Sequence, residues 1–383
     1  MVAKGDMVYA WSTDAEILKK GELGGAVTSL QKFALESGTV DAVLAVKKGQ
    51  DLYDAVPTLI TDPAKLVDTA GSLHCGTLLL ARPIKKYLSG NDRKIGVTVK
   101  GCDMMALLEL ERRGSINLDN FVTIGLNCGG SVSAVNARKM IADKFGVNPD
   151  DVHKEEIDKG QFIIEYGDEH KGISIDELEE EGYGRRSNCR RCKYKIPRNA
   201  DLACGNWGVI GPKAGKATFI EVCSDKGADL LNKAVAAGVL QTEAPIEKGI
   251  EIRGKVENAM LKLGEKWRRN DFKALGKDLW GTIQNETSRC IKCYSCIENC
   301  PVCFTVADEL RGDSRMIASG EVPPNPMFHL RRFAHISDTC INCGQCEELC
   351  PMDIPLALFS HAIRAEGDMA FEPKLGEASY NNK

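Results

Sequence analysis

Two copies of one cysteine pattern, about fifty residues apart, constrain this chain more than any other feature of its sequence. The first copy consists of Cys290, Cys293, Cys296, Cys300 and Pro301. The second copy repeats the spacing with Cys340, Cys343, Cys346, Cys350 and Pro351. Three cysteines at two-residue gaps present their thiolates from one short loop to one iron–sulfur cube, whereas the fourth, ahead of proline, ligates the neighbouring cluster. The pattern therefore predicts two [4Fe–4S] clusters that carry single electrons.

This crossed arrangement divides the eight cysteines into two ligand sets. One cluster is assigned to Cys290, Cys293, Cys296 and Cys350. The other cluster is assigned to Cys340, Cys343, Cys346 and Cys300. A disulfide framework is the first alternative, but it requires an oxidising compartment, and residues 1–20 contain no apolar signal-peptide region. Zinc is the second, but zinc sites use separated cysteine pairs without a third close cysteine and a trailing Cys-Pro.

Composition limits the remaining possibilities. The chain has 383 residues, enough for two or three domains, and a formal net charge of −4. This charge does not favour binding to nucleic acid or to an anionic membrane surface. No apolar run approaches the roughly 18 residues that span a bilayer. Sixteen cysteines without a secretion signal favour the reducing cytoplasm, with thiolates used for metal binding.

Hydrophobic periodicity predicts an α/β or α+β domain ahead of the cysteine motifs. Strands are expected at residues 7–12, 40–46, 94–99, 121–126, 162–166 and 217–222. Helices are expected at residues 26–36, 75–88, 104–113, 134–145, 176–181 and 224–239, the last with Ser224 as its N-cap. Residues 182–215 show little periodicity and are expected to form a functional loop. The predicted division is a domain at 1–253, a helical linker at 254–280, a ferredoxin domain at 281–365 and a loose tail at 366–383.

The ferredoxin domain is expected to be helical. Its two motifs are separated by a segment longer than the one in a compact ferredoxin that contains β-strands. That segment contains helix-like stretches at residues 306–310 and 327–335. The fold class is therefore an α/β (α+β) domain followed by an α-helical two-cluster ferredoxin domain.

Four further cysteines suggest a third metal site. Cys102 and Cys128 each follow a predicted strand, and the carboxyl ends of neighbouring strands converge at one edge of an α/β sheet. Cys189 and Cys192 form a CxxC pair in the predicted loop. The residues alone leave this site open, since a lone cysteine is normally a small buried hydrophobe and a CxxC pair also suits zinc or a redox function.

Several stretches resemble one known family, in the same order along the chain. Residues 24–30 read Gly-Gly-Ala-Val-Thr-Ser-Leu, residues 101–103 Gly-Cys-Asp, and residues 124–128 Ile-Gly-Leu-Asn-Cys. The CxxC pair is followed at residues 200–205 by Ala-Asp-Leu-Ala-Cys-Gly. Together these resemble the beta-subunit family of coenzyme F420-reducing hydrogenase and formate dehydrogenase. The resemblance covers about the first 280 residues.

The resemblance implies FAD and one [4Fe–4S] cluster in the first domain, which makes three clusters in all. The implied ligands of the third cluster are Cys102, Cys128, Cys189 and Cys192. Two departures leave that set open: Cys204 stands where the family commonly has an apolar residue, and Cys75 is also unusual. Either one is an alternative ligand.

The resemblance also places the two organic cofactors. Residues implied for FAD are Gly24, Gly25, Ala26, Val27, Thr28, Asn206, Trp207 and Gly208. The glycine pair precedes a helix whose free amides suit a pyrophosphate; a simple tight turn before a helix is the alternative, and it is the resemblance that favours the flavin. Coenzyme F420 carries a phosphate and an oligoglutamate tail, and a dense basic segment suits it: Arg185, Arg186, Arg190, Arg191, Lys193, Lys195 and Arg198. Charge compensation around an anionic cluster is the alternative for these residues.

Because the ferredoxin domain is C-terminal, the resemblance is strongest to the formate dehydrogenase branch of the family. It implies electron flow from a molybdenum or tungsten catalytic alpha subunit through the clusters to FAD, and hydride transfer to coenzyme F420. We expect no acid–base catalytic side chains in this chain. The alternatives are a subunit that oxidises reduced F420 for a hydrogenase, sulfite reductase or heterodisulfide reductase complex, and a flavin-free polyferredoxin adapter. A reductase for NAD ranks last, since no GxGxxG follows a predicted strand.

Overall fold

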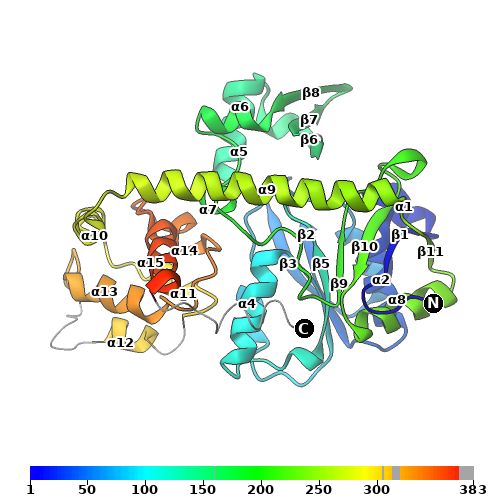
Figure 1. The fold of residues 1–383 in the computed structure, drawn as a ribbon, viewed down its shortest axis with the longest axis horizontal. Coiled ribbons are helices and arrows are strands. Elements are labelled where there is room, and N and C mark those ends of the chain that lie inside the picture. The colour runs from blue at the N-terminus through cyan, green and yellow to red at the C-terminus, as the bar shows by residue number, and fades with distance from the viewer. Residues whose placement is uncertain (159, 304–305, 313–319, 371–383) are drawn as a thin grey trace.

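The computed structural model describes residues 1–158, 160–303, 306–312 and 320–370. Its main sheet is built from β1 (Met7–Ser12), β2 (Ala42–Lys48), β3 (Ala55–Ile60), β4 (Ile95–Val99), β5 (Phe121–Leu126), β9 (Leu202–Gly205), β10 (Thr218–Val222) and β11 (Leu240–Glu243). The strand order is β11-β1-β10-β9-β5-β4-β2-β3 (Figure 1). The central strands β2, β4, β5 and β9 are parallel, and all other pairs are antiparallel. The parallel strands therefore bring their carboxyl ends to one edge of the sheet.

Helices cover both faces of this sheet. The first face carries α2 (Ala26–Glu36) and α8 (Asp225–Ala236), with the short α1 (Ala15–Lys20) beside them, and the second carries α3 (Ala81–Tyr87) and α4 (Gly101–Arg112). Successive side chains of a strand point to opposite faces, and β2 follows this rule. Val43 packs in the core beneath α2 and α8, whereas Leu44 packs beneath α3 and α4.

A small antiparallel sheet lies apart from the main one. Its strands are β6 (Val152–Asp158), β7 (Gln161–Tyr166) and β8 (Glu169–Ser174), and they pack with α5 (Ala134–Met140) and α6 (Ile175–Glu180). In Figure 1 this unit projects above the long helix α9 (Glu247–Ala274). Phe145 and Phe162 meet edge to face in its core, with ring centroids 6.0 Å apart.

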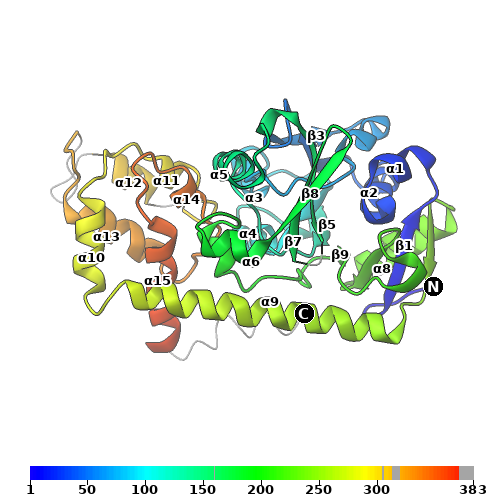
Figure 2. The same ribbon diagram turned by 90° about the horizontal axis from the view of Figure 1, so that it is seen from above.

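The C-terminal part contains helices alone among its described residues. They are α10 (Leu279–Thr287), α11 (Ser295–Glu298), α12 (Ala307–Arg311), α13 (Pro326–His335), α14 (Gln345–Glu348) and α15 (Leu356–Ala370). The 28-residue α9 runs along the sheet and reaches this part, as Figures 1 and 2 show. At its far end Leu275 is buried with Phe359 of α15. The expected fold class, an α/β part followed by a helical part, is confirmed.

Several expected elements coincide with the observed ones. The stretches at 7–12, 121–126 and 26–36 are β1, β5 and α2, and Ser224 caps α8 by accepting a hydrogen bond from the amide of Gly227. The helix expected at 75–88 is wrong in its first half, because α3 begins at Ala81. The amides of His74 and Cys75 instead donate to the Glu155 carboxylate, which holds this segment out of a helix.

Two other expectations need correction. Residues 182–215 do not form one irregular loop, since they contain α7 (Ser187–Arg190) and the interior strand β9. Four residues are too few to show a period, which explains why β9 was not predicted. Residues 366–370 continue α15 rather than starting a tail, and residues 371–383 lie outside the described residues. Within the described chain, none of the helices combines the length and the apolar character that crossing a bilayer requires.

Candidate functional site

The first cysteine motif surrounds a small hollow in the C-terminal part. A space of about 360 Å³ is lined by Cys290, Cys293, Cys296 and Cys350, together with Phe328 and Leu356. Cys350 belongs to the second motif, so this grouping has the crossed composition expected from the spacing. The neighbours of the four thiols are mainly apolar. Cys293 is exposed to solvent.

The second motif gathers around the last cysteine of the first. Burial raises the pKa of Cys340 to about 11, and the nearby Cys300 side chain contributes to the rise. Burial also raises the pKa of Cys343, with Cys300 and Cys346 adding to it. Cys300 therefore lies against all three close cysteines of the second motif. Buried thiols with raised pKa values become thiolates when positive metal ions offset the charge.

The two motif loops share an uncommon backbone. In the first, Lys292 and Tyr294 have φ values of 55° and 63°. At the equivalent positions of the second, Asn342 and Gly344 have φ values of 53° and 75°. Positive φ is rare for residues with a side chain. The repeated sequence thus folds into a repeated loop geometry.

The four cysteines proposed for the third cluster come from three elements. Cys102 lies in the first turn of α4, Cys128 follows β5, and Cys189 and Cys192 lie in and just after α7. Burial raises the pKa of Cys128 to about 11, and Cys189 and Cys192 add to it. Burial likewise raises the pKa of Cys102, with contributions from Cys192 and Cys128. The structure therefore brings these four side chains together.

Basic groups accompany this central set. Lys195 is buried and its ammonium group donates to the carbonyl of Cys189 at 3.5 Å. Burial opposes ionisation of Cys189, but Arg186 and hydrogen bonds from Ser131 lower its pKa below the usual value. The positive charges lie where an anionic cluster with thiolate ligands needs compensation.

The two alternative ligands lie elsewhere. Cys75 is buried beside Glu155, whose charge adds to the rise that burial causes in its pKa. Cys204 is buried in β9, where burial raises its pKa to about 12 and its charged neighbours are Arg253 and Glu221. Cys223 directly follows β10 and is half-buried. Among the described residues, no three Cys, His, Asp or Glu side chains are close enough to hold a single metal ion.

The two stretches expected to contact FAD lie along β1. Gly24 has φ 81°, and a Cβ there would come within 2.4 Å of the Lys216 carbonyl oxygen and 2.9 Å of Trp11 Cβ. Only glycine fits this position. The following helix α2 begins at Ala26, and no side chain caps its first amides. The carbonyl of Gly208 accepts a hydrogen bond from the Tyr9 hydroxyl at 2.7 Å.

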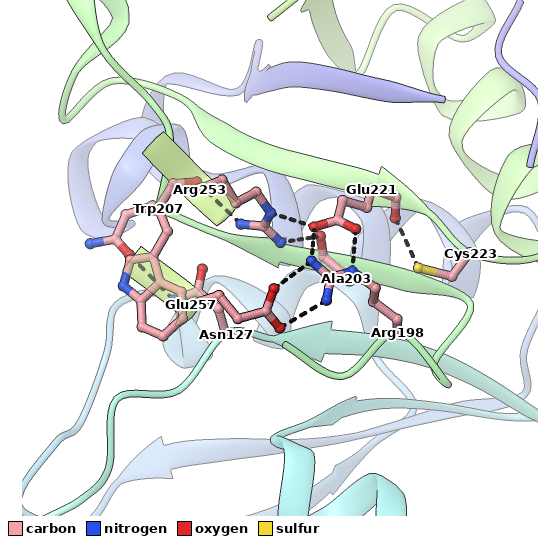
Figure 3. A network of polar contacts seen from close by, with 9 residues as sticks. Asn127, Arg198, Ala203, Trp207, Glu221, Cys223, Arg253 and Glu257 are labelled. Carbon is pink, nitrogen blue, oxygen red and sulfur yellow. Dashed lines mark hydrogen bonds and ion pairs between the residues drawn. The ribbon is translucent and has the colours of Figure 1, made fainter. Parts of the chain in front are cut away.

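A buried ion network adjoins the second stretch and was not anticipated from the sequence (Figure 3). Arg253 of α9 is 2% exposed and donates to Glu221 of β10, to the Trp207 carbonyl at 3.2 Å and to the Ala203 carbonyl at 3.3 Å. Arg198 binds Glu221 at 2.7 Å and bridges to Glu257 of α9 at 2.8 Å. The one signal that could have indicated this network is Glu221, a charged residue in the otherwise apolar, buried strand β10.

The basic residues expected to bind coenzyme F420 differ in their surroundings. Hydrogen bonds or ion pairs join Arg185 to Glu179 and the Gly129 carbonyl, Arg186 to Glu348, Lys195 to the Cys189 carbonyl, and Arg198 to two glutamates. Arg190 stacks on Trp267, with its guanidinium carbon 4.3 Å from the ring centroid. Arg191 and Lys193 line an open groove against α9.

This groove is a basic hollow beside Cys192 of the third cysteine set. It has a volume of about 600 Å³, and its lining includes Arg191, Cys192, Lys193, Lys262 and Arg268, with Asn258 and Glu265 also on its wall. Arg191 is 2% exposed and pairs with Asp271 at 2.7 Å through one nitrogen. Its other two guanidinium nitrogens have no partner among the described residues.

Three family models match most of the chain. Residues 7–85 match the N-terminal model of the coenzyme F420 hydrogenase/dehydrogenase beta subunit, and residues 92–248 match the C-terminal model of the same subunit. Residues 286–354 match a 4Fe-4S dicluster domain. The last match spans both cysteine motifs.

Similar proteins include two curated relatives and one solved structure. The F420-dependent formate dehydrogenase subunit beta of Methanocaldococcus jannaschii is 50% identical over 93% of both chains. The F420-dependent formate dehydrogenase 1 subunit beta of Methanococcus maripaludis is 50% identical over 94% of this chain and 92% of its own. A chain of the F420-reducing [NiFe] hydrogenase complex from Methanosarcina barkeri has a TM-score of 0.62 at 22% identity, covering 71% of this chain and 94% of that one. The last likeness concerns the fold.

Proposed function

The chain belongs to the beta-subunit family of coenzyme F420 hydrogenases and dehydrogenases, and from this premise we propose that it is the electron-transferring beta subunit of an F420-dependent formate dehydrogenase. The observation that carries the proposal is 50% identity to formate dehydrogenase beta subunits along 93% of the chain, including the dicluster domain. The relatives named as hydrogenase beta subunits match 68% or 69% of this chain, at 26% identity.

The proposed cofactors are three [4Fe–4S] clusters and one FAD. The twelve cysteines in three groups have the donor chemistry that such clusters need. The uncapped start of α2, directly after Gly24 and Gly25, suits the pyrophosphate of FAD, and Gly208 lets its backbone pack closely against the Gly249 carbonyl of α9. When bound, FAD would join the single-electron chemistry of the clusters to the two-electron hydride chemistry of coenzyme F420.

The chain's own residues would serve mainly to position these groups. Arg253 and Glu221 fix α9 against the sheet beside Trp207. Lys195 and Arg186 supply positive charge next to Cys189. The Asp103 carboxylate accepts hydrogen bonds from Lys100 and from the Leu80 amide, which anchors the first turn of α4 and Cys102. None of these roles requires a general acid or base.

We propose the groove beside Cys192 as the receptor for the anionic end of coenzyme F420. Its lining has four cationic side chains and one carboxylate, namely Arg191, Lys193, Lys262 and Arg268 against Glu265. A buried arginine with two unsatisfied nitrogens gains most from an anionic partner, since leaving such donors unpaired in a protein interior is costly. The more deeply paired Arg185 and Arg186 are then structural.

The proposed partner is a catalytic alpha subunit that oxidises formate at a molybdenum or tungsten centre, in the cytoplasm. The test is anaerobic purification from the native source, with quantification of flavin, iron and sulfide and identification of the subunits that copurify. About one FAD and about twelve irons per chain, together with formate-dependent reduction of F420, support the proposal. About eight irons, no flavin and no reaction with F420 would replace it with a polyferredoxin adapter. Copurification with heterodisulfide reductase, sulfite reductase or hydrogenase alone would replace formate as the electron source.

A further inference from the structure

Two asparagines join the loop that carries Cys189 to the loop that carries Cys340 and Cys343. The side-chain amide of Asn188 donates to the carbonyl of Asn342 at 3.2 Å. The amide of Asn342 donates back to the carbonyl of Asn188 at 3.0 Å. Both residues are buried. Asn188 directly precedes Cys189 of the central set. Asn342 directly precedes Cys343 of the second motif.

A glycine allows this close approach. At Gly344 a Cβ would come within 2.3 Å of Asn188 Oδ1 and 2.7 Å of Arg186 Nη2, and the residue has φ 75°. The equivalent position of the first motif is Tyr294, whose side chain would fill the same space. The two loops therefore differ, Tyr294 against Gly344, at the position where the second loop contacts Asn188.

Further polar contacts surround the asparagine pair. Arg186 donates to the Cys343 carbonyl at 3.3 Å and pairs with Glu348 at 3.0 Å. The Ser187 hydroxyl donates to Glu347 at 2.6 Å. Glu347 also accepts the amide of Ala357 at 3.1 Å, at the start of α15. Three successive residues before Cys189 thus contact the second motif, including its helix α14.

We propose that Asn188 and Asn342 are positioning residues of the electron path, and that electrons cross between the two parts of the chain at their junction. This inference rests on the proposed function. The set of Cys340, Cys343, Cys346 and Cys300 then faces the central set of Cys102, Cys128, Cys189 and Cys192. The set of Cys290, Cys293, Cys296 and Cys350 is the outer one, which agrees with the exposure of Cys293.

With both clusters bound, the step at this junction would be a single electron transfer. One cluster would lose one electron and the other would gain it, and no bond would form or break. Electron tunnelling falls steeply with distance and is faster through covalent and hydrogen bonds than across gaps. The route from the Cys343 backbone through Asn342 and Asn188 to Cys189 is covalent except for the reciprocal hydrogen bonds.

The test compares Asn188→Ala, Asn342→Ala and the conservative Asn188→Gln in the full chain. The matched control is Asn232→Ala, since Asn232 also makes two reciprocal hydrogen bonds, to the amide and carbonyl of Val2, far from any cysteine set. Two readouts are independent of turnover: iron content, and magnetic coupling between clusters in the electron paramagnetic resonance spectrum of the dithionite-reduced protein. A third is the stopped-flow rate at which reduced F420 reduces the C-terminal clusters.

We expect full iron content, weakened magnetic coupling, and at least a tenfold slower reduction of the C-terminal clusters in both alanine variants. Asn188→Gln should recover part of the rate, and Asn232→Ala should match the wild type. Unchanged coupling and unchanged rate in both alanine variants overturn the inference. Loss of iron in both also overturns it, because the pair would then serve folding. A wild-type protein that ignores F420 refutes the proposed function instead, while the magnetic coupling still reports on the junction.

Discussion

Arg253 of α9 and Glu221 of β10 form a buried ion pair that fastens this 28-residue helix to the main sheet. The same arginine donates to the carbonyls of Trp207 and Ala203, so its guanidinium group is used on several sides. Arg198 approaches Glu221 from the other side and extends the network to Glu257, back on α9 (Figure 3). Because α9 also packs against the C-terminal helices, this network helps to fix the position of the C-terminal part relative to the main sheet.

Replacing Arg253 with methionine should destabilise the protein. The change keeps much of the side-chain volume. It removes one of the two arginines that bind Glu221, and it leaves the carbonyls of Trp207 and Ala203 without this hydrogen-bond donor. Removing one partner of a buried pair typically costs about 3 kcal/mol of unfolding free energy. Urea denaturation measures it, with Lys255→Ala as the control, because Lys255 makes an exposed pair with Glu251 on the same helix. If Arg253→Met and Lys255→Ala lower the unfolding free energy by the same amount, the buried network stabilises the protein no more than an exposed ion pair does.

Glu221 should also make stability depend on pH. Burial alone would raise the pKa of this carboxyl, but hydrogen bonds and charge from Arg198 and Arg253 lower it below the usual value of 4.5. A lowered pKa in the folded state contributes stability that is complete above the unfolded pKa and is lost as the pH falls through the folded pKa. The difference in unfolding free energy between the wild type and Glu221→Gln should therefore shrink as the pH falls below about 4.5. A difference that stays constant from neutral pH into this acidic range contradicts the prediction.

The cysteine motifs were predictable because their spacing is local. Metal ligands in one short loop depend on a few consecutive residues, so Cys290 to Cys300 and Cys340 to Cys350 can be interpreted without knowing the fold. Cys102 and Cys128 needed one further step, the convergence of parallel strands at a sheet edge. The sequence left Cys204 open as an alternative ligand, and its neighbours Arg253 and Glu221 became visible only in the structure, because they depend on the position of β9 in the sheet.

Contacts between distant segments could not be anticipated in this way. Arg253 and Glu221 are 32 residues apart, and Asn188 and Asn342 are 154 residues apart. Each pair depends on how whole elements pack. The misplaced start of α3 has a similar cause, because Glu155 of the small sheet binds the amides of residues 74 and 75. Tertiary hydrogen bonds there override a local helical pattern.

Neutralising the basic groove should weaken F420 binding without slowing chemistry. In Lys262→Gln and Arg268→Gln, the KM for F420 should rise about tenfold, because each removed charge–charge hydrogen bond is worth about 1.4 kcal/mol or more. The kcat should stay the same. Lys266→Gln is the control, since Lys266 is an exposed residue of α9 outside the groove lining. The effect should diminish at high salt, where the Debye length shortens. A KM that does not change in either groove variant refutes this placement.

Gly24→Ala should cause loss of FAD. The new methyl group would come within 2.4 Å of the Lys216 carbonyl oxygen, and the backbone there has φ 81°. Gly38→Ala is the control that separates the steric clash from the strain of the left-handed backbone. Gly38 has φ 69°, but an added Cβ there has nothing within 4 Å. That control should cost about 1 kcal/mol from the left-handed backbone alone and keep its flavin. Flavin content after anaerobic gel filtration measures the outcome, and full FAD occupancy in Gly24→Ala would exclude this turn from the flavin site.

Single cysteine replacements should distinguish the ligands from the bystanders. Cys128→Ser removes a thiol from the central set, where its neighbours include Cys189 and Cys192, and should lower the iron content by about four atoms per chain. Cys204→Ser and Cys75→Ser should keep their iron, since their charged neighbours are Glu221, Arg253 and Glu155 rather than other cysteines of a ligand set.

Cys300→Ser tests the crossed ligation within the same experiment. If Cys300 serves the second motif, this variant should lose the electron paramagnetic resonance signal that Cys343→Ser also loses, and keep the signal that Cys293→Ser loses. The reason is that Cys300 lies against Cys340, Cys343 and Cys346, whereas the hollow of the first motif is completed by Cys350. A shared phenotype of Cys300→Ser and Cys293→Ser would mean that each motif binds its own cluster with all four of its cysteines.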